Sequence, residues 1–139
     1  MQIGRLTRRR RQIAVIGLGV LAVAVLAMPQ SVAAKKATSL EAAENCGSDP
    51  TAKTIDATYE WSGFAPARQA RITFVDETTG VSESSTQLAE RSGSFFASRS
   101  ANTHVGDTYH VEAELLNAKG DVIRGSEEVS TSFLIESCN

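Results

Sequence analysis

Three side chains able to bind a metal ion or transfer a proton stand at alternate positions in the stretch GDTYHVEAEL: His110, Glu112 and Glu114. Residues two apart in a β-strand share a face and lie about 6.5–7 Å apart. Zinc ligands lie about 2.0–2.2 Å from the metal, so neighbouring members share an ion only in favourable rotamers, and all three only under strain. We therefore interpret this face as the solvated side of a half-buried strand. A metal site that also draws in His104 is the alternative.

The sequence contains no other residue pattern that indicates a reaction. The motif Gly-x-Ser-x-Gly is absent, and only two histidines could serve as the base for a nucleophile. No spacing singles out a carboxylate pair among the 16 Asp and Glu residues. Asp76, Glu77 and Asp121 fall in expected turns, and turn formation accounts for them without calcium. We predict a protein that is not an enzyme and that holds no metal or other cofactor.

The strand that carries His110 belongs to a regular series. Its other face is apolar, with Tyr109, Val111, Ala113 and Leu115. The same period of two recurs along the chain after residue 53, with turn residues between the strands and no helical period of any length. The pattern predicts an all-β fold, a single antiparallel β-sandwich of about seven strands. The expected strands are 54–61, 70–75, 81–88, 94–97, 108–116, 122–124 and 128–135.

The aromatic residues divide into core positions and candidates for contact with a partner. Tyr59 and Trp61 share the parity of the apolar positions in their strand, which favours core packing over stacking on a carbohydrate. Phe64 lies in a turn, and Phe96 has the opposite parity to the phenylalanine before it. Both are therefore candidates for exposed partner contacts, together with His104 in an expected loop.

Residues 1–34 have the layout of a secretory signal peptide. Five arginines precede the 16-residue apolar run Ile13–Met28, and small residues follow at Val32–Ala34. The apolar run is shorter than the roughly 20 residues that a membrane-spanning helix needs. We predict that the signal peptide is cleaved and that the protein is secreted, outside the cell or at its surface. An uncleaved membrane anchor is the alternative.

The charge of the mature chain excludes two classes of partner. Cleavage after Ala34 leaves 105 residues, which is enough for one domain. These residues keep nine of the 14 Lys and Arg and all 16 Asp and Glu, a formal charge of −7. Nucleic-acid binding depends on clustered basic residues, and anionic membrane surfaces repel an acidic protein. We therefore expect no nucleic-acid partner and no membrane contact after cleavage.

The only two cysteines, Cys46 and Cys138, nearly bracket the mature chain. In an exported protein, such a pair predicts a structural disulfide. It would close a loop of 93 residues, for which chain entropy gives an upper value of roughly 4–5 kcal/mol. Before this domain, which we place at 51–139, residues 35–50 are expected to form a tether. A possible capping box from Thr38 to Glu41 predicts at most one helical turn there.

Three motifs of glycine and apolar residues mark the expected strands. They are a Gly-Phe-x-Pro turn before an alternating strand, a later Gly-x-Phe strand, and a Gly-x-x-Tyr-x-Val-x-Ala strand. The positions are Gly63, Phe64 and Pro66, then Gly93 and Phe95, then Gly106, Tyr109, Val111 and Ala113. Through these motifs, residues 54–135 resemble the small immunoglobulin-like or fibronectin type III-like domains of secreted and surface bacterial proteins.

The resemblance implies an immunoglobulin-like sandwich, and it carries little information on function. By analogy, Tyr109 is expected to be a corner tyrosine whose hydroxyl bonds to upstream backbone. The chain departs from the family in two places. Ala67 and Arg68 stand where a glycine is usual, and the terminal cysteine pair is not the bridge between sheets of antibody domains.

The function predicted on these grounds is that of a secreted, non-catalytic binding module. It would recognise an extracellular or cell-envelope protein or glycan through loops at 62–66, 100–106 and 117–120, because loops on a rigid scaffold carry recognition. Two alternatives remain. One is a small secreted inhibitor or effector of an extracellular enzyme, and the other is a metal-binding protein.

Overall fold

The computed structural model describes residues 35–49 and 51–138, which form two antiparallel β-sheets. The expected signal peptide and its apolar run lie outside the described residues. None of the described residues belongs to a helix that could span a membrane. The all-β class predicted from the period-two pattern is therefore confirmed for the described part of the chain.

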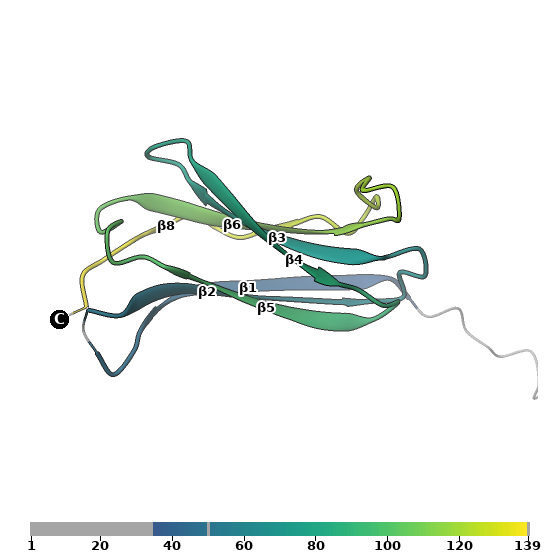
Figure 1. Ribbon diagram of the computed structural model, residues 1–139, viewed down its shortest axis with the longest axis horizontal. Coiled ribbons are helices and arrows are strands. Elements are labelled where there is room, and N and C mark those ends of the chain that lie inside the picture. Colours follow the sequence, from purple (N-terminus) through teal and green to yellow (C-terminus); the bar gives the residue numbers. More distant parts are fainter. Residues whose placement is uncertain (1–34, 50, 139) are drawn as a thin grey trace, which may run out of the picture. The chain divides into compact units, whose positions relative to one another are not determined.

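In each sheet, neighbouring strands run antiparallel to one another (Figure 1). The first sheet has the order β1-β2-β5, with β1 Ala37–Cys46, β2 Lys53–Ser62 and β5 Gly93–Ser100. The second has the order β4-β3-β6-β7, with β4 Ser82–Leu88, β3 Gln69–Asp76, β6 Thr108–Leu116 and β7 Glu128–Val129; the short strand β8, Phe133–Leu134, also pairs with β6.

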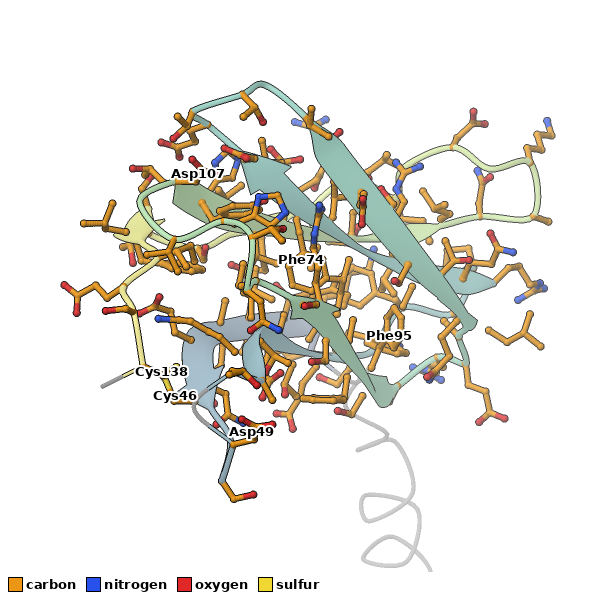
Figure 2. All side chains as sticks on the ribbon, turned by 60° about the vertical axis from the view of Figure 1, so that its left-hand side comes forward. Cys46, Asp49, Phe74, Phe95, Asp107 and Cys138 are labelled. Carbon is orange, nitrogen blue, oxygen red and sulfur yellow. A yellow bond between two sulfur atoms is a disulfide. The ribbon has the colours of Figure 1, made fainter. Side chains whose placement is uncertain are left out.

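A single hydrophobic core is built from the inner faces of both sheets. Every second residue of β2, β3 and β6 is buried, as the alternation of side chains along a strand requires. Figure 2 shows Phe74 of β3 and Phe95 of β5, which both belong to the buried cluster. Tyr59 and Trp61 stack at 5.5 Å between ring centroids and are buried, so their predicted core role is confirmed.

The structure corrects the interpretation of residues 35–50 as a tether with at most a helical turn. Ala37–Cys46 is a ten-residue strand, β1, paired with the whole of β2 from Ala37–Ser62 to Cys46–Lys53. Its even-numbered residues from Thr38 to Glu44 are half-buried, and Leu40 and Ala42 pack on the core. A single helical turn has little stability of its own, whereas pairing with β2 gives every second residue of this edge strand backbone hydrogen bonds and partly buries two apolar side chains.

The last part of the chain is less regular than the pattern predicts. The expected strand 122–124 is reduced to an isolated bridge between Val122 and Leu116. The expected strand 128–135 is split into the two-residue strands β7 and β8. The edge strand expected at 81–88 does form, as β4, and all of its residues are exposed.

Antiparallel pairing gathers the connections at two opposite ends (Figure 1). At one end, β1 meets β2 at Cys46 and Lys53, and β3 ends beside the start of β6. We name this the disulfide end; its described residues are 47–49, 51–52, 77–81, 101–107 and 135–138. The opposite end comprises 63–68, 89–92 and 117–127, together with residues 35 and 36.

Candidate functional site

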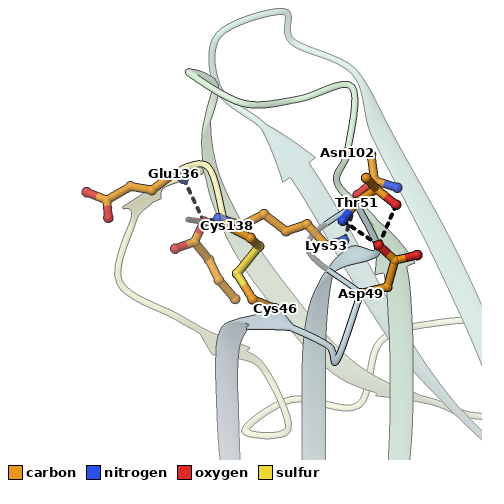
Figure 3. Close-up of a disulfide and its surroundings, with 8 residues drawn as sticks. Cys46, Asp49, Thr51, Lys53, Asn102, Glu136 and Cys138 are labelled. Carbon is orange, nitrogen blue, oxygen red and sulfur yellow. Dashed lines mark hydrogen bonds and ion pairs between the residues drawn. A yellow bond between two sulfur atoms is a disulfide. The ribbon is translucent and has the colours of Figure 1, made fainter.

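A disulfide closes one end of the described domain. Cys46, the last residue of β1, is bonded to Cys138, with 5.7 Å between their Cα atoms (Figure 3). The predicted pairing is confirmed. The bond joins the first sheet to the segment that follows β8 of the second sheet, so it links the two sheets at this end.

Polar contacts surround the disulfide and tie further segments to it (Figure 3). The buried Lys53 Nζ lies 2.8 Å from Glu44 Oε1, which also accepts a hydrogen bond of 2.9 Å from the amide of Glu136. The amide of Lys53 donates to Asn102 Oδ1 at 2.6 Å, and the amide of Ala101 donates to the Lys53 carbonyl at 2.9 Å. The β5–β6 loop and the C-terminal segment are thus both fastened to β1 and β2.

Asp76, His104 and Asp107 meet at the same end, and we refer to them as the Asp76 cluster. His104 Nδ1 lies 3.2 Å from Asp107 Oδ2 and 3.7 Å from Asp76 Oδ2. Asp76 is the last residue of β3, whereas the other two lie in the β5–β6 loop. Pairing of Asp76 with Tyr109 in the β3–β6 register brings the two segments together.

A tight turn places the two loop members of the cluster on one side. The amide of His104 donates to the Ala101 carbonyl at 3.0 Å, and the amide of Asp107 donates to the His104 carbonyl at 2.9 Å. Gly106 has a φ of 95°, which lies in the left-handed region that a side chain disfavours. Backbone hydrogen bonds within the loop therefore fix its conformation. They bring His104 into contact with Asp107, three residues further along the chain.

The carboxylate of Asp76 is buried with only one of its two oxygens bonded. The residue is 1% exposed, and its Oδ1 accepts hydrogen bonds from the amides of Thr78 at 2.9 Å and Thr79 at 3.1 Å. Its Oδ2 accepts no hydrogen bond of ordinary geometry, although the neighbouring Tyr109 hydroxyl also helps to hold down the pKa of Asp76. Burial alone raises the pKa of Asp76, but the bonds from Thr79 and Thr78 outweigh burial, and the pKa lies below its ordinary value. The site thus contains a buried carboxylate with one oxygen bonded to two backbone amides and the other facing His104.

Two further buried polar groups near Asp76 lack partners. The hydroxyl of Tyr109 makes no hydrogen bond of ordinary geometry, and neither does Arg99 Nη1, although the guanidinium carbon of Arg99 lies 5.8 Å from the Tyr109 ring centre. Burial raises the pKa of Tyr109; the neighbouring Asp76 carboxylate adds to that rise and Arg99 opposes it. The His104 ring meets the Tyr109 ring edge-on at 5.6 Å.

The expected role of Tyr109 as a corner tyrosine is wrong in this chain. Its hydroxyl forms no bond to upstream backbone. Tyr59 instead makes a tyrosine–backbone bond, donating to the Ser126 carbonyl at 2.6 Å near the opposite end. The cause is the position of Tyr109 opposite Asp76 in the β3–β6 register, which places its ring and hydroxyl among charged side chains.

His110 lies apart from the Asp76 cluster, on the outer face of β6. Its Nδ1 lies 2.7 Å from Glu77 Oε1 and its Nε2 lies 3.1 Å from Glu112 Oε1, while Glu114 pairs with Arg71. Partial burial lowers the pKa of His110, but the bonds to Glu112 and Glu77 outweigh it, and the pKa lies above 6.5. The outward orientation predicted for this face is confirmed, and His104 does not join it.

The candidate partner residues Phe64 and Phe96 have opposite environments. Phe64 is 0% exposed, because residues 63–68 fold back over the core and its amide donates to the Arg91 carbonyl at 2.9 Å. The prediction that Phe64 makes an exposed contact is therefore wrong. Phe96 is 59% exposed on the outer face of β5, so its expected exposure is confirmed. A partner contact through Phe96 stays a prediction.

The three loops expected to carry recognition do not form one surface. Residues 62–66 and 117–120 lie at the opposite end, whereas 100–106, which contains His104, lies at the disulfide end. Because their separation follows from the direction of each strand, a single partner of small size reaches only one of the two sets.

Sequence reasoning missed Asp76 and Asp107 as members of a site. Asp76 falls in an expected turn, Asp107 stands between an expected loop and an expected strand, and the 27 residues between Asp76 and His104 give no sign of contact. Two local signals were present. Asp76 precedes Glu-Thr-Thr-Gly, a composition in which the aspartate bonds to backbone two residues on, and His104-x-x-Asp107 stands directly before a strand. Neither signal identifies its partner without the β3–β6 register.

Comparisons with known proteins place no family on this chain. No protein-family model and no curated protein matches it. Among solved structures, one described as the ApaA protein of Bordetella pertussis is 10% identical, with a TM-score of 0.35 over 75% of this chain and 94% of its own. A target of the Northeast Structural Genomics Consortium is 7% identical, with a TM-score of 0.35 over 76% of this chain and 87% of its own. Similarities of this size carry no conclusion about function.

Proposed function

We propose that this chain is an exported, non-catalytic binding module that recognises an extracellular or cell-envelope protein or glycan through its disulfide end. The layout of residues 1–34 supports export. A disulfide is also consistent with an oxidising compartment. The acidic charge of −7 after residue 34 favours a partner with a neutral or basic surface.

The strand order supports an immunoglobulin-like sandwich as the scaffold. The orders β1-β2-β5 and β4-β3-β6-β7 correspond to strands A-B-E and C′-C-F-G of immunoglobulin-like domains. In such domains, the loops at one end of the sandwich carry recognition while the sheets stay constant. By this correspondence the disulfide end contains the A–B, C–C′ and E–F connections, whereas the B–C and F–G loops that carry recognition in antibody variable domains match 63–68 and 117–127 at the opposite end. The choice of the disulfide end therefore rests on its own contacts and not on the antibody analogy.

The observation that carries the proposal is the bracing of these connections. The disulfide, the Lys53–Glu44 ion pair and the bond from the Lys53 amide to Asn102 hold three segments of the disulfide end in fixed positions. A binding surface that is rigid before contact loses less conformational entropy on association, and this raises affinity. Bracing of this kind suits a surface that is presented to a partner.

The disulfide end also presents apolar side chains to solvent. Three large apolar residues at or beside its connections are exposed: Val81, Val105 and Leu134. The described chain resumes at residue 35, at the other end of β1 from Cys46.

A capture experiment with matched variants at the two ends tests the proposal. The exported protein, immobilised by a tag inserted at residue 35, is incubated with extracellular and envelope material. We expect Val105→Lys with Leu134→Lys to reduce capture about 10-fold or more, a typical effect of losing contacts at an interface centre. The control pair Leu88→Lys and Val122→Lys, also exposed but at the opposite end, should leave capture unchanged.

Equal loss with both pairs of variants, or loss only with the control pair, would contradict recognition by the disulfide end. The same capture separates the adhesive from the inhibitory alternative. A captured extracellular hydrolase that loses activity at one-to-one stoichiometry would identify the chain as an inhibitor.

A further inference from the structure

We propose that the Asp76 cluster is a binding site for one divalent first-row transition-metal ion of the zinc class. The proposal goes beyond the binding function above, since it assigns a ligand to three named side chains. It rests on the donor set, on the distances between the donors, and on the unpartnered buried oxygen of Asp76.

The donor set selects the class of metal. Asp76 and Asp107 each offer a carboxylate oxygen, and His104 offers an imidazole nitrogen. Imidazole with carboxylate suits zinc and its first-row neighbours, whereas calcium takes six to eight oxygen ligands and magnesium keeps most of its water. Two carboxylates also match the charge of a divalent cation. His104 and Asp107 are each about a quarter exposed, so the cluster is open to solvent on one side.

The distances between the donor atoms suit a tetrahedral centre. With metal–ligand bonds of about 2.0–2.2 Å, ideal tetrahedral ligands lie about 3.3–3.6 Å apart. His104 Nδ1 lies 3.2 Å from Asp107 Oδ2 and 3.7 Å from Asp76 Oδ2. All three donor atoms lie within 4.8 Å of one another. Because the distance between the Asp76 and Asp107 donors is bounded only by this 4.8 Å, the half-buried His104 and Asp107 side chains would move by up to about 1 Å to close the site around an ion.

The free oxygen of Asp76 is the independent sign of a ligand. Asp76 is 1% exposed, and the oxygen without a hydrogen bond, Oδ2, is the one that faces His104. Leaving an ionised oxygen buried without a partner is costly, and a bound cation removes that cost. The other oxygen is fixed by the amides of Thr78 and Thr79, as the outer bonds of metal-ligating carboxylates commonly are.

The site would also act on the surface that the proposed function uses. His104 and Asp107 belong to the β5–β6 loop, and Asp76 begins the β3–β4 turn, so an ion held by all three would fasten these two connections to each other. The disulfide and Asn102 already fasten the β5–β6 loop and the C-terminal segment to the first sheet. Metal binding would thereby complete the bracing of the disulfide end.

Titration of zinc into the whole purified protein, stripped of metal with a chelator, tests the site by calorimetry. We expect one equivalent to bind. His104→Ala and Asp107→Asn should each weaken binding about 10-fold or more, because even groups that only support a ligand contribute that much. The matched control is His110→Ala, which removes the other histidine together with its Glu77 and Glu112 contacts. It should leave zinc affinity unchanged.

Folding of each variant is checked by its far-ultraviolet circular dichroism and thermal midpoint. Cobalt(II) provides a readout that needs no variant, because visible bands of tetrahedral intensity would appear on the wild-type protein at one equivalent. Three results would overturn the proposal: no saturable zinc binding, binding that survives His104→Ala, or binding that is lost with His110→Ala. A His104 that merely titrates with pH and ignores zinc would identify the cluster as an ion pair.

Discussion

The two ends of the domain differ in whether their buried polar side chains have hydrogen-bond partners. Near the opposite end, the indole nitrogen of Trp61 donates to the Glu90 carbonyl at 2.9 Å, and the hydroxyl of Tyr59 donates to the Ser126 carbonyl at 2.6 Å. The Ser126 hydroxyl is itself bonded on both sides. All of the buried side-chain atoms without a hydrogen-bond partner in the described residues lie in strands next to the disulfide end: Asp76 Oδ2, Arg99 Nη1 and Tyr109 OH.

The buried polar groups near the opposite end are all bonded within the protein, whereas those near the disulfide end leave room for bonds to a ligand. An unpaired buried polar group costs about 1–3 kcal/mol, and folded proteins contain few of them. Three such atoms lie close to a disulfide and a buried ion pair. This region therefore combines a braced backbone with buried polar atoms that have no hydrogen-bond partner. Native proteins depart from full satisfaction mainly at functional sites. We infer that the opposite end stabilises the fold and that the disulfide end binds.

The largest effect should come from the core of the opposite end. Replacing the fully buried Phe64 by alanine should lower the free energy of unfolding by about 3–5 kcal/mol, because it leaves a cavity. The control is Phe96→Ala, in which the same side chain is removed from an exposed position and should change stability by about 0.5 kcal/mol or less. Urea unfolding measures both. A similar decrease in the free energy of unfolding for the two variants would mean that Phe64 is not part of the packed core at this end.

Removing the disulfide should have the next largest effect, which should combine a loss of stability of the whole domain with additional loosening of the disulfide end in the folded state. We expect the double variant Cys46→Ser with Cys138→Ser to lower the free energy of unfolding by about 2–4 kcal/mol. Without the bond, the long loop between the two residues gains conformational entropy in the unfolded chain. Native-state hydrogen exchange should accelerate more at the amide of Gly106, which donates to the Ile135 carbonyl, than at the amide of Phe64. Uniform acceleration at both amides would show that the bond does not specifically brace the disulfide end.

The two buried tyrosines test the contrast between bonded and unbonded groups directly. Tyr59→Phe leaves the Ser126 carbonyl without its donor and should cost about 1–3 kcal/mol. Tyr109→Phe removes a hydroxyl that has no partner and should cost close to nothing. Thermal or urea unfolding of both variants gives the comparison. If Tyr109→Phe is as damaging as Tyr59→Phe, the Tyr109 hydroxyl is bonded to Asp76 and the disulfide end is less open than we infer.

The smallest effect concerns the pH dependence that His110 contributes. Its pKa in the folded protein is raised above 6.5, since the bonds to Glu112 and Glu77 outweigh burial. A raised pKa gives stability that is complete below the unfolded value and is lost as pH rises through the folded value. Replacing His110 by glutamine should therefore lower the free energy of unfolding more at about pH 5.5 than at about pH 8. Equal losses at the two pH values would contradict the shift.

The strands were predictable where alternation is strong and local. Tyr109, Val111, Ala113 and Leu115 specify the inner face of β6 without any knowledge of its neighbours, and all four are buried. Strand β1 was missed because only Leu40 and Ala42 of its inward positions are apolar, and its pairing with β2 decides its conformation.

Positions that depend on the path of a turn or on register were not predictable. Phe64 looks exposed because it stands in a turn, yet that turn folds back over the core, as its bond to Arg91 shows. The Asp76 cluster requires the pairing of Asp76 with Tyr109, which no residue pattern encodes. Local sequence therefore determined which faces are apolar, and tertiary pairing determined which polar groups meet.

The central claim is that the disulfide end, unlike the rest of the described domain, is built to take a ligand. The most direct test is a nitrogen–proton NMR spectrum of the two histidine rings in the wild-type protein, recorded during addition of zinc. Our account predicts that the His104 signals shift and saturate at one equivalent while those of His110 stay in place. Movement of His110 alone, or of neither ring, would contradict it.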